Sequence, residues 1–102
     1  MIAVNLFRPK IKKIDNLDDL KNVRVNDAVE IPRIRARGIV YSLDSIRGNP
    51  VIRLIERKDG ELCQLGYEFD GNEINWLNYK RGMLCTEEDT KKYEPKLRRA
   101  GL

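Results

Sequence analysis

The chain has 102 residues, with 20 lysines and arginines, 16 aspartates and glutamates and no histidine, so its formal net charge is +4 at pH 7. This length is that of one domain, and it can bury a modest hydrophobic core without disulfide or metal support. The missing histidine excludes Ser-His-Asp and Cys-His catalysis, a histidine proton switch and any metal site built on histidine. We therefore expect no cofactor, and we predict that the protein is not an enzyme.

The first 22 residues are predicted to form a basic arm followed by a short helix. Pro9 forbids a helix in the arm and favours an extended segment or an edge strand. Asn16 is a suitable N-cap for one or two helical turns that end near Asn22, because the acidic side chains after it favour the positive end of a helix.

Residues 23–85 alternate β-branched or aromatic runs with tight-turn signals about every eight to twelve residues. Pro32 ends the first run, and the strongest strand candidate, 35–43, contains Gly38, where we expect a bulge. Asp59-Gly60 and Asp70-Gly71 are hairpin signals. Further strands are expected at 51–57, 62–69, 74–79 and 83–85. The pattern predicts a mainly β fold, a small five- to six-stranded barrel of about 60 residues.

Two short segments of this region resemble the opening of SH3-like barrels of the KOW and Tudor kind. They read Val25-Asn26-Asp27-Ala28-Val29-Glu30-Ile31 and Arg37-Gly38-Ile39-Val40. In them a turn, a Val-x-Ile strand, a loop and a Gly-x-Val strand follow one another. The resemblance implies a binding fold, and because such folds serve many unrelated functions it assigns none.

The last region, 86–102, is predicted to hold a capped short helix and a basic tail. Thr86 is a good N-cap with an acidic residue three positions later, which predicts a helix over 86–93. Pro95 is expected to stop this helix, so the residues after it are expected to form a loose basic tail.

The two cysteines and the lack of a long apolar run indicate an intracellular, cytoplasmic protein. Cys63 and Cys85 are too few for a disulfide scaffold and lack the C-x-x-C spacing of zinc or redox sites. We expect two thiols on neighbouring strands, where a bridge stays possible if those strands pair. Residues 1–7 are too short for a signal peptide, and no run nears the roughly 20 residues of a membrane span.

Alternating arginines indicate a phosphate-binding strand face. Arg33, Arg35 and Arg37 have the period of two that places side chains on one face of a strand. Adjacent guanidiniums repel one another unless an anion lies opposite, and arginine matches phosphate with a bidentate fork. The candidate nucleic-acid contacts are these three arginines with Arg53 and Arg57 on the next strand and Lys10, Lys12 and Lys13 in the arm.

A simpler interpretation of the same cations stays open. The arginine face can be an exposed strand face that pairs with Glu30, Glu56 or Glu61 across the sheet. The basic arm can be a solubilising terminus or a strand that covers a sheet edge.

Aromatic side chains flank the Asp70-Gly71 hairpin signal and are candidates for contacts with a partner. The candidates are Tyr67, Trp76 and Tyr79. On a barrel surface they can stack on bases or grip a peptide. In the alternative interpretation Trp76 and Phe69 belong to the core, which leaves Tyr79, beside Lys80-Arg81, as the most exposed ring.

Two functions follow from these patterns. The first is a non-enzymatic module that binds nucleic acid, DNA or RNA, through its phosphates. The second is a small protein–protein interaction module, an adaptor or inhibitor of a larger complex, for which uneven charge is useful: residues 1–37 hold nine basic and five acidic side chains, and residues 67–95 hold four and seven. We expect no metal, because the acidic spacing fits no calcium loop, and neither a membrane nor a small-molecule substrate.

Overall fold

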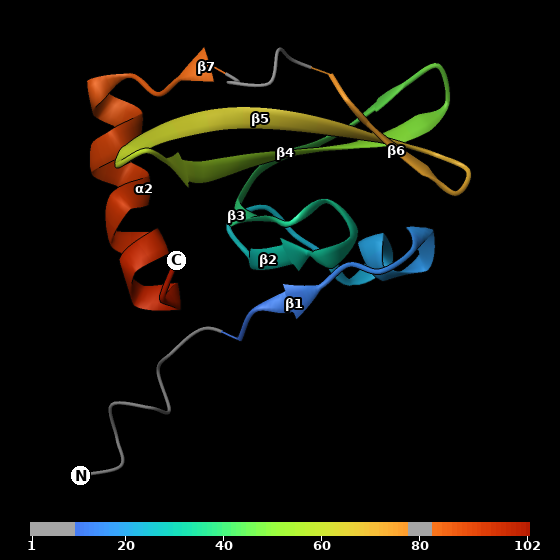
Figure 1. Ribbon diagram of the computed structural model, residues 1–102, viewed down its shortest axis with the longest axis horizontal. Coiled ribbons are helices and arrows are strands. Elements are labelled where there is room, and N and C mark those ends of the chain that lie inside the picture. Colours follow the sequence, from blue (N-terminus) through green and yellow to red (C-terminus); the bar gives the residue numbers. More distant parts are fainter. Residues whose placement is uncertain (1–9, 78–82) are drawn as a thin grey trace, which may run out of the picture.

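The computed structural model describes residues 10–77 and 83–102, which form a mainly β domain with one C-terminal helix (Figure 1). In chain order the elements are β1 (Lys12–Lys13), the 3₁₀ helix η1 (Leu17–Asn22), β2 (Ala28–Ile31), the 3₁₀ turn η2 (Pro32–Ile34), β3 (Ala36–Ile46), β4 (Asn49–Lys58), β5 (Glu61–Asp70), β6 (Glu73–Trp76), β7 (Met83–Leu84) and α2 (Glu87–Ala100). The mainly β class predicted from the sequence is confirmed.

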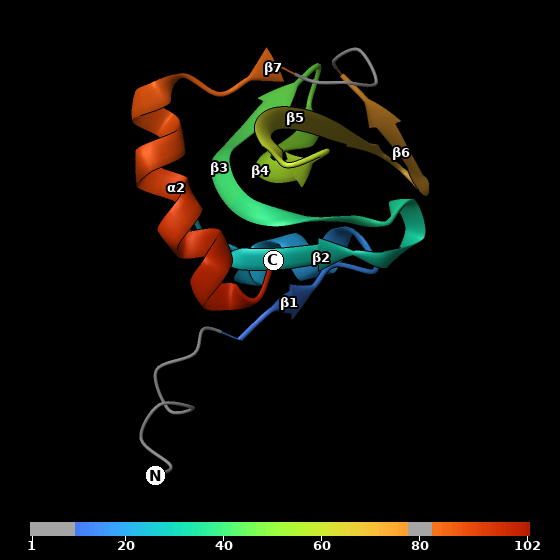
Figure 2. The ribbon, with the colours of Figure 1, turned by 60° about the vertical axis from the view of Figure 1, so that its left-hand side comes forward.

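The strands form a single curled sheet. Its order is β1-β2-β3-β4-β5-β6, and β7 pairs with β5 beside β6. β1 runs parallel to β2, and every other pairing is antiparallel. Figure 2 shows the sheet curling around its own interior, with α2 packed outside the curl. Among the described residues no ladder closes the sheet and seven strands are present, so the predicted closed barrel of five or six strands is not confirmed.

The start of the fold matches its sequence prediction. η1 begins after Asn16, whose side chain accepts the Asp19 amide while the Asp19 side chain accepts the Asn16 amide. This reciprocal cap satisfies two backbone donors that the first turn leaves free. Before it, β1 covers the outer edge of β2, so the described end of the basic arm is an edge strand. Pro9 lies outside the described residues.

The long strand β3 is shared between two parts of the sheet. It pairs with β2 up to Ile39 and with β4 from Ile39 onward. Gly38 lies at this change of partner, and a Cβ placed there would be 2.2 Å from the Ile55 carbonyl oxygen. Only a residue without a side chain permits such an approach of two backbones. The expected irregularity is present, but the register shifts between Val40 and Ser42 rather than at Gly38.

Tight turns connect the central strands. Asp59 and Gly60 join β4 to β5 with φ angles of 51° and 82°, as a type I′ turn requires, so this hairpin signal is confirmed. Arg47 and Gly48 join β3 to β4 in the same way, with φ angles of 53° and 81°. The hairpin between β5 and β6 is confirmed too, although its turn is Gly71–Asn72, one residue later than expected.

Both faces of the sheet are buried over much of their length. Inside the curl the core consists mainly of residues from β2 to β5, which are Val29, Ile31, Val40, Ile52, Leu54, Leu65, Tyr67 and Phe69. Outside the curl, α2 covers a second cluster, in which Ala28, Ile39, Ile55 and Leu62 pack against Tyr93, Leu97 and Ala100. The helix is therefore part of the folded core.

The predicted Thr86 cap at the start of the C-terminal helix is confirmed, but the predicted stop at Pro95 and the loose tail after it are wrong. α2 runs through Pro95 to Ala100, and the expected loose tail is its last turn and a half. An internal proline costs about 3 kcal/mol, because it has no N–H for the Lys91 carbonyl. Tyr93, Leu97 and Ala100 offset this cost by packing on the sheet, since their spacing places them on one helix face, and burying a single leucine is worth about 1.5–3 kcal/mol.

Both cysteines are free thiols, Cys63 on β5 and Cys85 directly after β7, the strand that pairs with β5. Cys63 on β5 lies opposite Leu84, and the Cys85 amide donates to the Leu62 carbonyl. Cys63 faces the interior of the curl, whereas Cys85 packs against the α2 cluster. The expected neighbouring strands are confirmed, and the register directs the two thiols to opposite faces.

In the portion of the chain that the structure describes, no helix has both the length and the apolar character needed to cross a membrane.

The close contact at Gly38 predicts a specific instability. Gly38→Ala should lower the free energy of unfolding by at least about 2 kcal/mol, because the new methyl group meets a backbone oxygen that cannot rotate away. Gly48→Ala is the control: it has open space around it and costs only the strain of a positive φ, about 1 kcal/mol. Urea denaturation measures both, and equal midpoints for the two variants would contradict this account of the fold.

Candidate anion-binding site

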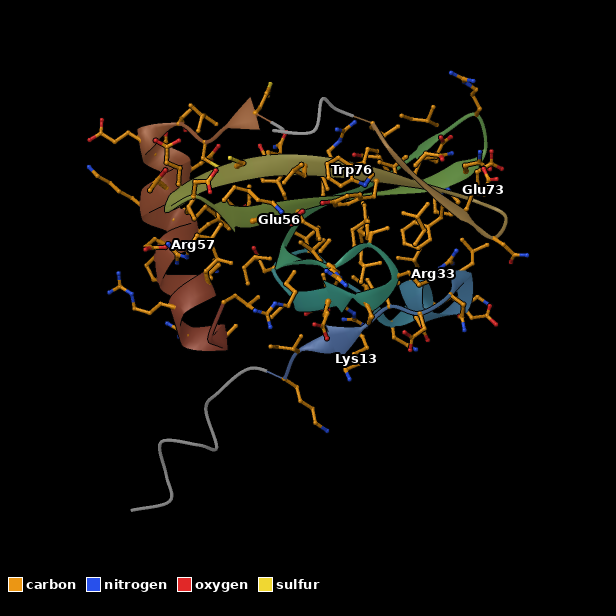
Figure 3. All side chains as sticks on the ribbon, viewed as in Figure 1. Lys13, Arg33, Glu56, Arg57, Glu73 and Trp76 are labelled. Carbon is orange, nitrogen blue, oxygen red and sulfur yellow. The ribbon has the colours of Figure 1, made fainter. Side chains whose placement is uncertain are left out.

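A pocket of about 270 Å³ opens where β3, β4 and the end of the chain after α2 meet. The residues that line it are Arg35, Arg37, Glu56, Arg57, Lys58 and Leu102. We call it the β3–β4 pocket. Figure 3 shows Glu56 and Arg57 on the side of the molecule near α2, with Arg33 toward the other end.

The arginines near the start of β3 do not form the expected stripe. Pro32 begins η2 instead of a strand, so Arg33 lies in this turn, where it donates to the Asn72 carbonyl. Arg35 follows as the C-cap with φ 53° and ψ 37°, a left-handed conformation. Regular alternation starts only at Ala36. Arg35 and Arg37 line the same pocket despite this, whereas Arg33 does not.

Arg57 anchors the end of α2 to β4. Its Nη1 and Nη2 atoms donate to the two carboxylate oxygens of Glu94, at 3.1 Å and 2.6 Å, and its Nε lies 3.4 Å from the Leu102 carbonyl oxygen. The bond to Glu94 raises the pKa of Arg57, and the same bond lowers the pKa of Glu94. Such a bidentate pair fixes the orientation of both groups. Arg57 is therefore part of the pocket wall as well as a candidate contact.

The floor of the pocket is Glu56, a buried carboxylate that sequence reasoning did not select as functional. It is 2% exposed and accepts a hydrogen bond from the Tyr67 hydroxyl. Burial raises the pKa of Glu56, while Tyr67, the charge of Lys58 and the Arg37 amide partly oppose that rise. Burial and then Glu56 raise the pKa of Tyr67, so the phenol remains the donor.

The signal for Glu56 is present in the sequence. Glu56 continues the inward alternation of Ile52 and Leu54 on β4, so a charged residue falls at a core position. A carboxylate there needs a donor, because an unpaired buried charge is very costly. Tyr67 supplies that donor from β5, eleven residues away in sequence.

The charges around the pocket do not cancel. The Lys58 Nζ atom lies 3.7 Å from Oε1 of Glu56, and the Arg57 guanidinium is bound by the Glu94 carboxylate. Within residues 10–77 and 83–102, neither Arg35 nor Arg37 makes a side-chain ion pair or hydrogen bond, so the expected pairing with Glu30, Glu56 or Glu61 is absent there. Two guanidiniums thus face the same opening without a partner in this described part.

The other predicted cations are dispersed. Arg53 pairs with Asp44 at 3.3 Å and lines a different pocket. Lys12 bonds Asp27 at 2.8 Å and the Asn22 carbonyl at 2.7 Å, which makes it a clamp between β1 and the loop before β2. Burial acts to raise the pKa of Asp27, but the bonds from Lys12 and from the Arg24 amide bring it below its ordinary value.

Lys13 is the arm residue that strand pairing connects to the pocket residue Arg37. It lies opposite Glu30 in β2, and Glu30 lies opposite Arg37 in β3. Directly paired residues share one face of a sheet, so Lys13 and Arg37 are on the same face. Lys10 is exposed at the start of the described chain.

The predicted aromatic contacts that the structure describes lie in two environments. Tyr67 is 1% exposed and Phe69 is 2% exposed, so both are core residues. Trp76 is 42% exposed and meets the Tyr67 ring edge-on, with the ring centres 5.9 Å apart, so the expectation that it is core is wrong. Tyr79 lies outside the described residues.

No protein-family model matches the sequence, and comparisons with curated proteins and with solved structures find no significant similarity. Across the described ranges no group of three or more cysteine, aspartate or glutamate side chains is placed to hold a metal ion.

The buried carboxylate predicts a characteristic dependence of stability on pH. Because the pKa of Glu56 is raised above 4.5, the folded state binds its proton more tightly than the unfolded state. This contribution is complete below pH 4.5 and is lost as the pH rises through the folded-state pKa. Asp27 and Glu94 have lowered pKa values, so their contributions are lost only as the pH falls.

Glu56→Gln should therefore remove a fall in the free energy of unfolding that the unmodified protein shows above pH 4.5. Urea titrations at a series of pH values measure it, with Glu61→Gln, an exposed glutamate on β5, as the control. Parallel curves for Glu56→Gln and the unmodified protein would contradict the assignment.

Proposed function

We propose that this protein is a non-enzymatic module that binds nucleic-acid phosphates through the β3–β4 pocket and the surface beside it. The observation behind the proposal is that Arg35 and Arg37 converge with Lys58 on one opening, with no acceptor for the two guanidiniums in the described chain. Guanidiniums bind phosphate through paired hydrogen bonds, and opposed positive charges become favourable when an anion lies between them.

The backbone at Arg35 supports a role for its side chain. A left-handed conformation costs about 1–2 kcal/mol for a residue other than glycine. Arg35 occupies it at φ 53°, as the residue that closes η2. Arg47 has the same φ, so what distinguishes Arg35 is that its strained backbone directs the side chain to the β3–β4 pocket.

The cations extend beyond the pocket in a direction that a strand of nucleic acid can follow. Lys13 shares a sheet face with Arg37, and Lys10 precedes it on the exposed arm. Glu30 lies between Lys13 and Arg37 on this face, and Glu56 and Glu94 lie at the pocket. Other acidic residues lie far from it: Figure 3 shows Glu73 and Arg57 at opposite ends of the molecule. With a net charge of only +4, phosphate binding depends on the local excess of cations at the pocket, where Arg35 and Arg37 have no acidic partner in the described chain.

A small SH3-like barrel is part of the same proposal. The curled, sheet-dominated domain is compatible with such a fold, and the shared strand β3 curves as barrel strands do. Small barrels of this kind serve as binding modules, which agrees with a site built from strand residues.

Arg35→Glu tests this function. The variant should weaken binding of labelled single-stranded DNA or RNA by about tenfold or more at low salt, because it replaces a phosphate donor by a repelling charge. Arg47→Glu is a matched control: it makes the same charge change at a residue with the same φ of 53°, on the turn at the opposite end of β4. Fluorescence anisotropy titrations at several salt concentrations measure the affinity of both variants for the oligonucleotide. An equal loss of affinity in the two would show that Arg35 is not part of a specific binding site.

An exposed apolar strip favours a second candidate, a protein–protein interaction module. Trp76, Met83 and Leu84 are 42%, 61% and 66% exposed on β6 and β7, the two strands that pair with the same edge of β5. Large exposed apolar side chains at a sheet edge are typical of partner contacts.

The strip makes its own prediction. If a protein is the partner, Met83→Ser with Leu84→Ser should reduce its capture from native lysate by about tenfold or more, because contact residues of this kind dominate binding energy. The Arg35→Glu variant should then capture it normally. Unchanged capture by the double variant would exclude this strip as the interface.

A further inference from the structure

We propose that the β3–β4 pocket receives a terminal phosphomonoester of a nucleic-acid strand, a 5′-phosphate end, rather than an internal phosphodiester. This inference rests on the proposed function and names the group that the pocket recognises.

The shape of the pocket suits an end group. Its volume of about 270 Å³ lies just below the roughly 300–1,000 Å³ of typical small-molecule sites, so it holds one phosphate with part of its sugar. Its walls are fixed on two sides: Gly38 holds β3 against Ile55, and the Arg57–Glu94 pair holds α2 against β4. A continuous backbone runs along an open surface and does not need such a walled recess.

The charge of the lining side chains matches a dianion. Four cations line the pocket, which are Arg35, Arg37, Arg57 and Lys58. Two carboxylates offset part of this charge: Glu94 binds Arg57, and Glu56 lies near Lys58. Counting side chains alone, four positive and two negative charges leave +2. A phosphomonoester carries about −1.5 to −2 at neutral pH, whereas a diester carries about −1, so the monoester is the better match.

The cationic donors of the pocket differ in whether they already have a partner. Arg35 and Arg37 offer guanidinium forks with no ion-pair partner in the described chain, so they are the direct phosphate contacts. Arg57 is already bound bidentately by Glu94 and closes the far wall. Lys58 adds a point charge at the rim.

The same chemistry is present in a phosphorylated peptide and in a free nucleotide. We commit to a nucleic-acid end because Lys13 lies on the same sheet face as Arg37, on the far side of Glu30, where a phosphate after the first one can meet a second cation. A peptide has no such repeating negative charge.

The test compares two single-stranded oligonucleotides of one sequence, labelled at the 3′ end, of which one carries a 5′-phosphate and the other a 5′-hydroxyl. Fluorescence anisotropy at low and moderate salt gives the affinity of each. The 5′-phosphate form should bind about tenfold more tightly, a difference of about 1.4 kcal/mol. Arg35→Gly should abolish that preference, and Arg47→Gly should keep it.

The two glycine variants are matched in charge and backbone. Each removes one arginine at φ 53°, and glycine adopts this conformation without strain, so neither change endangers folding. Arg35 lines the pocket, and Arg47 does not. A difference between the variants therefore reports on the pocket and not on net charge.

Each other outcome overturns the proposal in a distinguishable way. If both oligonucleotides bind with equal affinity and Arg35→Gly weakens both equally, the pocket recognises internal diesters. The proposed function would then still hold, and only the preference for a 5′-phosphate would be wrong. No salt-sensitive binding of either would remove the proposed function as well. Competition by a free nucleoside 5′-monophosphate as strong as that of the phosphorylated oligonucleotide would identify a small-molecule ligand, and equally tight binding of a phosphoserine peptide would identify a protein partner.

Discussion

The approach of the β3 backbone at Gly38 to the Ile55 carbonyl is the constraint on which the rest of the structure depends. At this point β3 leaves β2 and joins β4, so the sheet curls and encloses its core. The same bend brings Arg35 and Arg37 across from Arg57 and Lys58, which are about twenty residues further along the chain. A side chain at position 38 would push the two strands apart and open the pocket together with the core.

Two charged interactions fix the pocket once the bend has formed, and they act in different ways. Arg57 binds Glu94 at the surface and holds α2 in place, although an exposed pair contributes little to stability by itself. Glu56 is buried, and its desolvation is offset only in part by Tyr67, Lys58 and the Arg37 amide. The buried Glu56 carboxylate therefore lowers the stability of the fold at the floor of a cationic pocket. Titratable groups perturbed in this way are common at functional sites.

Local signals in the sequence predict much of the fold. The Asn16 cap, the stop at Pro32 and the Asp59-Gly60 hairpin depend on near neighbours, so propensity and turn chemistry suffice. The open curl of the sheet and the end of α2 depend on packing between distant segments, which is why Pro95 does not end the helix as its local effect predicts. The β3–β4 pocket itself is not predictable from alternation. Alternation selects Arg35 and Arg37 for a stripe that the left-handed turn breaks, and it makes Glu56 a surface partner although Glu56 is buried.

The account requires that the β3–β4 pocket is where an oligonucleotide contacts the protein. The most direct measurement is an NMR titration of isotope-labelled protein with a short single-stranded oligonucleotide, followed through backbone amides and arginine Nε–H signals. The account predicts the largest shifts at Arg35, Arg37 and Lys58, with small changes at Trp76 and Leu84. Shifts concentrated at Trp76 and Leu84, with the arginine signals unmoved, would contradict it.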